Sequence, residues 1–192
     1  MNQPVDRRLL INILQAAYSG EMGAAYAYRG HWKSVSDVDQ RIRIQRIESE
    51  EWLHRKKVSQ MLRDLDERPQ RVREVKMWVI GRTIALLCHL AGWFLPMYFA
   101  GRVESRNVLE YEAAALHAGS LGLTDFEAEL KTMAAVEREH RVFFAQVIAG
   151  HRLLTPMRKI FPWQVEQAAP TDEGPRNPRL LVEGTLQSTV DS

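Results

Sequence analysis

The sequence predicts an all-α fold in which several helices form a bundle. Apolar residues recur every three or four positions in its long segments, which is the spacing of one helix face. Polar or glycine-containing turns separate these segments, as in "KSVSDVDQ" (residues 33–40) and "HAGSLGLTD" (residues 117–125). Almost no segment shows the strict alternation of a half-buried strand. A helical domain without a sheet is therefore expected.

Five helices account for these patterns. Asp6 can cap the first helix, and Ser36 or Asp37 can cap the second, which ends before Pro69. The third runs from about residue 72 into a long apolar stretch at residues 77–101. Glycine and proline at 92 and 96 break that stretch. The fourth and fifth helices are expected at about 96–118 and 124–149.

Length and composition favour one folded domain. The chain has 192 residues, of which 45% are hydrophobic, enough for a single buried core. We expect a helical domain over residues 1–151. Residues 152–192 are proline-rich and lack a sustained period, so an extended or disordered tail is expected there.

The charges and the single cysteine exclude several classes of protein. The formal net charge is only +2, which argues against nucleic acid as the partner. Cys88 lies among apolar residues, so it is expected in the core of a protein from the reducing cytoplasm. The N-terminus does not resemble a signal peptide. Arg82 and His89 interrupt the apolar stretch, which argues against a membrane span but allows peripheral contact at the inner face of a membrane through Met77 to Gly101.

Two pairs of a glutamate and a histidine have the same spacing. They are Glu51 with His54 and Glu137 with His140. Residues three apart share a helix face, so each pair could bind a metal ion or form an exposed ion pair. The spacing alone leaves both interpretations open.

Two further glutamates change that balance. Glu21 interrupts the apolar face of the first helix, and Glu104 lies among small residues of the fourth. Helices joined by a tight turn bring together residues equidistant from it. The midpoint of Glu21 and Glu51 is residue 36, and that of Glu104 and Glu137 falls between residues 120 and 121. Both midpoints lie inside predicted turns, so both pairs stand roughly 23 Å above their turns.

These polar residues occupy positions that apolar residues should fill. In the second helix, Glu51 and His54 share one face with Ile47 and Val58, whereas Glu50 and Glu139 are expected to face solvent. Buried carboxylates are costly unless they are neutralised, paired or bound to metal. Two helices giving one Glu each and two giving Glu-x-x-His is the ligand set of the di-iron site in ferritin-like bundles. The candidate ligands are Glu21, Glu51, His54, Glu104, Glu137 and His140.

The sequence therefore predicts a ferritin-like four-helix bundle with an additional apolar crossover helix. Residues 72–95 would span roughly 36 Å as a helix, the length such a crossover needs. The expected cofactor is two Fe ions per chain, with Mn not excluded. We assign Glu21, Glu51 and His54 to one ion and the other three ligands to its neighbour, with Glu51 and Glu137 as bridges.

Four motifs resemble those of one family, the demethoxyubiquinone hydroxylases of ubiquinone biosynthesis. They are "GEMGAAYAYRGH" (residues 20–31), "EEWLH" (50–54), "AGRVESRNVLEY" (100–111) and "EREH" (137–140). The resemblance covers residues 6 to about 149. Where the family has a histidine before the tyrosine of the third motif and a glutamine closing the first, this chain has Glu110 and His31.

The resemblance implies a function and its partners. It implies an O₂-dependent di-iron monooxygenase that hydroxylates a hydrophobic prenylated quinone, docks on a membrane and draws on an external electron donor. Glu51, Glu137 and Tyr111 would be its catalytic residues. Tyr111 lies seven residues beyond Glu104, as the family pattern requires, and could gate the site or relay an electron or a proton. Core packing is the alternative role for Tyr111 and for the similarly spaced Tyr28.

Other interpretations stay open at this point. A ferritin-like ferroxidase or a peroxidase of the rubrerythrin type would use the same metals, and a non-catalytic helical scaffold would use none. Homo-oligomer formation is also open. The remaining histidines, among them His31 and His117, lack carboxylates at ligand spacing and are expected at the surface or beside the ligands. Aromatic residues could form an interfacial belt or pack in the core: Trp78, Trp93, Phe94, Tyr98, Phe99 and Trp163.

Overall fold

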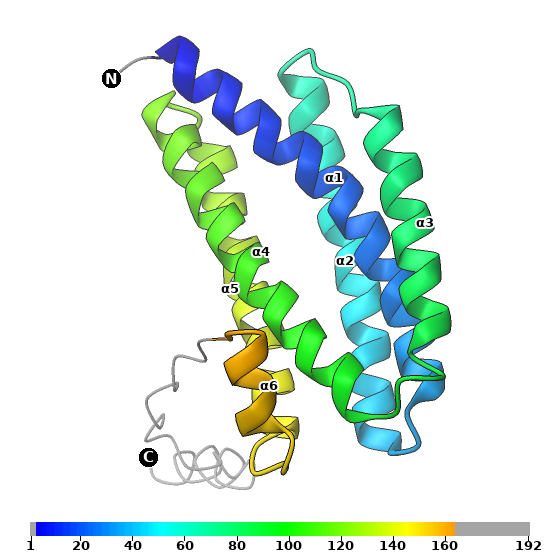
Figure 1. Ribbon diagram of the computed structural model, residues 1–192. Helices are drawn as coiled ribbons and strands as arrows, with labels where there is room; N and C mark the ends of the chain where they lie inside the picture. Colours follow the sequence, from blue (N-terminus) through cyan, green and yellow to red (C-terminus); the bar gives the residue numbers. More distant parts are fainter. Residues whose placement is uncertain (1–2, 164–192) are drawn as a thin grey trace, which may run out of the picture.

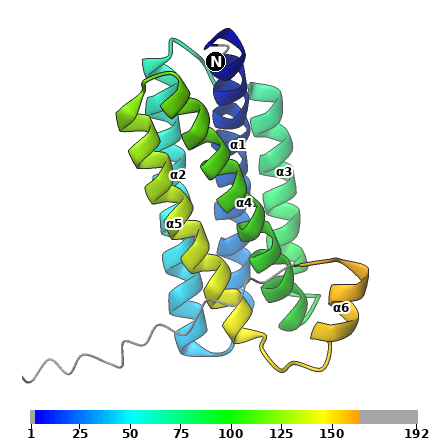
Figure 2. The ribbon, with the colours of Figure 1, turned by 90° about the vertical axis from the view of Figure 1, so that its left-hand side faces the viewer.

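The computed structural model describes residues 3–163, and its regular secondary structure is entirely helical. Helices α1 and α2 form one antiparallel hairpin, and α4 and α5 form a second; the two hairpins pack into an elongated bundle (Figures 1 and 2). The predicted all-α bundle is confirmed. The helices are α1 (Gln3–Ser34), α2 (Val38–Asp64), α3 (Arg71–Leu87), α4 (Phe94–Ser120), α5 (Thr124–Val147) and α6 (Leu154–Ile160).

The turns within the two hairpins lie where the sequence places them. The side chain of Asp37 caps α2 by accepting a hydrogen bond of 2.9 Å from the backbone N–H of Gln40. Gly122, with φ of +73°, adopts the left-handed conformation in the turn before α5. Asp6 does not cap α1, because the helix already includes Gln3. Its carboxylate instead lies 2.8 Å from Nδ1 of His117, which links the two hairpins at one end of the bundle.

Helix α3 packs along α1 and ends earlier than expected. A Cβ atom at Gly30 would overlap the backbone of Ala85, and one at Gly81 would overlap the backbone of Gly23, so the two helices approach closely at these glycines. The helix stops at Leu87 rather than near residue 95. Gly92, with φ of +73°, lies in the connection to α4. The apolar stretch is thus divided between two helices.

The core consists of two apolar clusters with a polar layer between them. On α1, Leu10 and Leu14 belong to one cluster and Tyr28 to the other, and Glu21 lies between them. The same separation occurs around the Glu-x-x-His pairs of α2 and α5. The polar layer is therefore enclosed by apolar side chains above and below.

The segment after α5 folds back onto α4, which corrects the predicted start of the tail at residue 152. Helix α6 forms at Leu154–Ile160, and the buried Trp163 packs against Gly101. The indole N–H of Trp163 donates a hydrogen bond of 2.7 Å to Oγ of Ser105. The rest of the predicted tail, residues 164–192, lies outside the described residues.

The outer face of α3 is apolar and exposed. It presents Val72 and Val75, and further along Val79 and Leu86, to the surface. Within residues 3–163, no helix is both long and apolar enough to cross a bilayer. The aromatic residues of the predicted belt differ in exposure: Trp78 and Trp93 are exposed, Phe99 is half-buried, and Phe94, Tyr98 and Trp163 are buried.

Candidate metal centre

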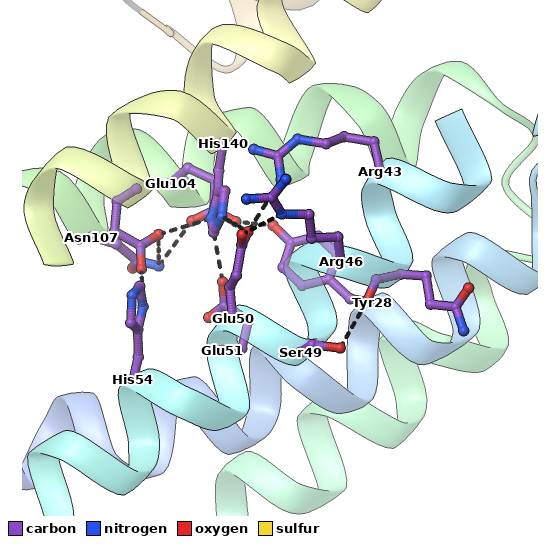
Figure 3. Close-up of polar contacts among 12 residues, drawn as sticks. Tyr28, Arg43, Arg46, Ser49, Glu50, Glu51, His54, Glu104, Asn107 and His140 are labelled. Carbon is purple, nitrogen blue, oxygen red and sulfur yellow. Dashed lines mark hydrogen bonds and ion pairs between the residues drawn. The ribbon is translucent and has the colours of Figure 1, made fainter. Parts of the chain in front are cut away.

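The six predicted ligand residues meet in the polar layer. Glu21 comes from α1, Glu104 from α4, and the two Glu-x-x-His pairs come from α2 and α5. All six side chains are buried, with at most 3% of the residue surface exposed. Figure 3 shows His54 and Glu51 from α2 pointing toward Glu104 and His140.

Two overlapping groups of ligand atoms could each hold a metal ion. The first contains Glu21, Glu51, His54 and Glu137, and the second contains Glu51, Glu104, Glu137 and His140. Within each group the ligand atoms all lie within 4.8 Å of one another. Glu51 and Glu137 belong to both groups, which is the position of carboxylates that bridge two ions.

Six of the buried side-chain atoms that lack hydrogen-bond partners among residues 3–163 belong to these ligand residues. Both carboxylate oxygens of Glu51 are buried and unpartnered, as are one oxygen each of Glu21 and Glu137 and Nδ1 of both histidines. Nδ1 of His54 lies 2.8 Å from Oε1 of Glu137, but without the alignment of a hydrogen bond. Buried polar atoms left without partners are costly in a folded protein. Metal ions bound in the two ligand groups would give these atoms partners.

Two tyrosines hold the remaining carboxylates in a reciprocal arrangement. The hydroxyl of Tyr28 on α1 donates a hydrogen bond to Glu104 on α4, and the hydroxyl of Tyr111 on α4 donates one to Glu21 on α1. Each tyrosine lies seven residues after the glutamate of its own helix. Because the two helices run antiparallel, one spacing serves both contacts. Both tyrosines therefore contact candidate ligands.

Asn107 is a site residue that the sequence analysis missed. Its amide donates a hydrogen bond of 3.1 Å to Oε2 of Glu104, and it lies 3.5 Å from Oε2 of Glu137. Its position three residues after Glu104, one turn along the same helix face, was the available signal.

Glu50 does not face solvent as expected, and this is a correction. Its Oε2 atom lies 2.7 Å from Nε2 of His140, and its carboxylate also accepts hydrogen bonds from Arg43 and Arg46 (Figure 3). Burial would raise the pKa of Glu50, but the hydrogen bonds from His140 and Arg46 lower it to about 2. An ionised Glu50 keeps the proton of His140 on Nε2, which leaves Nδ1 free to bind a metal. Glu139 is exposed, as expected.

Burial and mutual repulsion separate the pKa values of the clustered carboxyls. Burial, followed by repulsion from Glu137, raises the pKa of Glu51 and Glu104 well above the usual value. Burial alone would raise the pKa of Glu137 as well, but its contacts with Glu104 and the two histidines lower it instead. Four carboxyls this close cannot all ionise without a counter-charge. The cluster thus has the electrostatic character of a site for cations.

A large apolar cavity adjoins the cluster. It has a volume of about 730 Å³, lies between α1, α3 and α4, and is bordered by Glu21, Tyr28 and Tyr111. Most of its wall is apolar and includes Met77, Ile84 and Leu95. A molecule in this cavity would thus contact residues that also contact the candidate ligands.

The remaining histidines discussed above and the cysteine differ in their burial and contacts. His31 is buried and lines the cavity, so a surface position is wrong for it. His117 is half-buried and pairs with Asp6. Cys88 is buried, as expected, and burial raises the pKa of its thiol to about 11. This keeps the thiol protonated and unreactive.

Comparison with known proteins gives no relative on which to base a function. No family model, no curated protein and no solved structure matches this chain. Its function must be inferred from the buried cluster and the adjoining cavity.

Proposed function

We propose that the chain is an O₂-dependent di-iron monooxygenase of ferritin-like architecture, which hydroxylates a hydrophobic quinone ring. One observation carries the proposal: two overlapping ligand groups share Glu51 and Glu137 and adjoin an apolar cavity of about 730 Å³. The motifs that resemble the demethoxyubiquinone hydroxylases agree with it.

In this proposal each ion has its own carboxylate and its own imidazole. Glu21 and His54 would bind one ion and Glu104 and His140 the other, with Glu51 and Glu137 bridging. When bound, two iron ions supply the redox chemistry that activates O₂. The orphaned oxygen and nitrogen atoms fit this set, because they belong to residues that would contact the ions.

The remaining residues would orient ligands and control protons. Tyr28 and Tyr111 fix the orientation of Glu104 and Glu21 through their hydroxyl groups. Burial, together with repulsion from Glu21, raises the pKa of Tyr111 well above its usual value, so its hydroxyl keeps its proton. Tyr111 also lines the cavity, so its hydroxyl, which donates its proton to Glu21, would lie beside a bound substrate with its oxygen free to accept a hydrogen bond.

The cavity accounts for the kind of substrate. Its apolar wall would bind a hydrophobic ring and exclude water from the reacting atoms. The exposed apolar face of α3 lies on the outside of the same wall and carries the exposed basic residues Arg71, Arg73 and Lys76. An apolar helix face with basic residues suits the surface of an anionic membrane. We infer that α3 docks there and that the substrate enters from the lipid.

The test is complementation combined with metal analysis. The gene should restore quinone synthesis in cells that lack the quinone-ring hydroxylase, and the purified protein should contain about two iron ions per chain. The Glu137→Ala variant should fail on both counts, whereas the control Glu139→Ala should behave as the wild type. Iron or peroxide oxidation without complementation would favour a ferroxidase or peroxidase. If the protein binds no metal, the proposal is wrong and the cluster has only a structural role.

A further inference from the structure

His31 is a buried polar residue that neither the metal ligands nor the core explains. Its side chain lies in the cavity wall with 3% of the residue surface exposed, and its buried Nε2 atom has no hydrogen-bond partner among residues 3–163. Its ring stacks on those of Tyr28 and Phe144, at centroid distances of 6.3 and 6.0 Å. Stacking positions the imidazole but leaves the hydrogen-bonding capacity of Nε2 unused.

Within residues 3–163, no charged side chain forms an ion pair with His31. Because Gly30 meets Ala85 across the interface of α1 and α3, His31 lies at the level of Ile84 and Cys88, which also line the cavity. Burial lowers the pKa of His31 to about 4, so the imidazole is uncharged at neutral pH. A neutral imidazole can donate or accept one hydrogen bond in this part of the cavity. It cannot neutralise a carboxylate or a phosphate.

The distance from His31 to the metal-ligand residues limits the size of the ligand. Tyr28 meets Glu104, and Tyr111 meets Glu21, so the centre of the cluster lies between the levels of Glu21 and Tyr28 on α1. His31 is therefore roughly 10 Å further along the axis of α1, at a rise of about 1.5 Å per residue. A six-membered ring with oxygen atoms on opposite sides fits this span: one oxygen reaches His31 while the other side faces the cluster.

We propose that His31 is the substrate-recognition residue of the cavity, whose imidazole forms a hydrogen bond to one uncharged oxygen of an otherwise apolar cyclic molecule. The proposal deepens the proposed function and rests on it for the choice of a quinone as ligand. It assigns the orientation of the ring: the oxygen bound by His31 points away from the cluster, and the opposite oxygen, with the ring carbons beside it, faces the cluster.

The test measures binding without any turnover. The full-length chain is loaded with redox-inert Zn²⁺ and titrated calorimetrically with decyl-1,4-benzoquinone and with decylbenzene, which has the same chain but no oxygen. We expect His31→Leu to weaken binding of the quinone about tenfold and to leave decylbenzene binding unchanged. His31→Gln, which keeps a donor and an acceptor, should retain most of the affinity. His89→Leu makes the same chemical change at an exposed histidine and should have no effect.

Two results would overturn the assignment. One is quinone affinity that is the same in His31→Leu and the wild type; the other is an equal loss for both probes, which would indicate a change of cavity shape. If His31→Leu does not fold, the imidazole ¹⁵N shifts of His31 in the wild-type protein decide, assigned through His31→Gln. They should move with the quinone and not with decylbenzene, and unmoved shifts would refute the assignment.

The outcomes for His31 and for the proposed function are separable. A chain that binds the quinone through His31 but neither binds iron nor hydroxylates would refute the proposed function alone. An iron-loaded, active hydroxylase whose quinone affinity does not depend on His31 would refute the recognition role alone.

Discussion

The two hairpins of the bundle are alike in their inward-facing residues and different in what surrounds them. Each contributes one Glu, a tyrosine seven residues later and one Glu-x-x-His pair, and the tyrosines cross between α1 and α4. Outside this shared set the resemblance ends. Glu50 supports His140 from α2, but the equivalent residue on α5 is Val136, so α5 offers no such carboxylate to His54.

The coverings of the two hairpins differ as well. Helix α3 packs along α1 at Gly30, whereas α4 is covered by Trp163 at Gly101. The cavity lies on the α3 side, and the residue of α4 that corresponds to His31 is Ala114. In the proposed function, the repeated residues would give the two ions the same set of ligand types. The unrepeated residues would make the surroundings of the two ions differ and give the substrate a single side of approach.

Loss of either shared glutamate is expected to have the largest effect. Glu51→Ala and Glu137→Ala should each abolish binding of both ions, because each belongs to both ligand groups. Metal analysis after dialysis against iron should find far less than one ion per chain, compared with about two in the wild type. Glu139→Ala is the matched control. Retention of one full ion in either variant would contradict the bridging assignment.

The covering of α1 can be tested with a pair of glycine substitutions. Gly30→Ala should lower the free energy of unfolding by about 3 kcal/mol, since its Cβ overlaps the backbone of Ala85. Gly20→Ala, on the same helix with open space around it, should raise the free energy by about 0.5–1 kcal/mol. Urea unfolding measures both. Equal effects at the two positions would contradict the close packing of α3 on α1.

Removal of the support that only one histidine receives should weaken metal binding unequally. Glu50→Gln should lower the affinity for metal by about 10- to 100-fold, since His140 loses the carboxylate that fixes its tautomer. The loss should affect the ion bound by His140 more strongly, which a competition titration with a chelator resolves as two unequal steps. Glu139→Gln should leave both steps unchanged. A uniform loss for both ions would argue that Glu50 acts through stability.

His31, whose counterpart on the second hairpin is Ala114, is expected to make the stability of the fold depend on pH. The folded protein keeps this imidazole neutral down to about pH 4, whereas the unfolded chain protonates it below about pH 6.5. Its contribution is therefore complete above pH 6.5 and is lost as the pH falls toward 4, by about 2.5 kcal/mol at pH 4.5.

Urea unfolding of the metal-free protein at pH 7 and 4.5 measures this contribution. The difference in free energy between the two pH values should shrink by about that amount in His31→Gln and stay the same in the exposed control His89→Gln. An unchanged difference in His31→Gln would show that the imidazole titrates normally in the folded protein.

The sequence predicted the bundle and the convergence of six residues because both depend on simple periodicities. Residues equidistant from a turn meet, and a polar residue on an apolar face must be buried; these two rules sufficed for Glu21, Glu51, Glu104 and Glu137. The hydrogen bonds of Tyr28 and Tyr111 agree with the spacing of seven residues between each tyrosine and the glutamate of its own helix.

Features that depend on contacts between hairpins could not be predicted in this way. Glu50 is rotated by about 100° from Glu51, which on an isolated helix indicates solvent. The approach of α5 gives it His140 as a partner instead. On an isolated α1, His31 would be exposed; in the folded chain it is buried, because α3 packs on that side of α1. The end of α3 at Leu87 and the formation of α6 depend on packing against α1 and α4, which no periodicity records.

The crossed tyrosines also bear on how the chain folds. Each hairpin forms from contacts between neighbouring helices and can assemble quickly. Neither hairpin alone can supply the tyrosine hydroxyl that its glutamate accepts from, because the hydroxyl for Glu21 lies on α4 and that for Glu104 on α1. A shift of one residue between the docking hairpins would separate both tyrosines from their carboxylates at once. Only the correct alignment of the hairpins therefore forms both tyrosine hydrogen bonds. The residues beside the candidate metal centre thus also disfavour misaligned docking of the hairpins during folding.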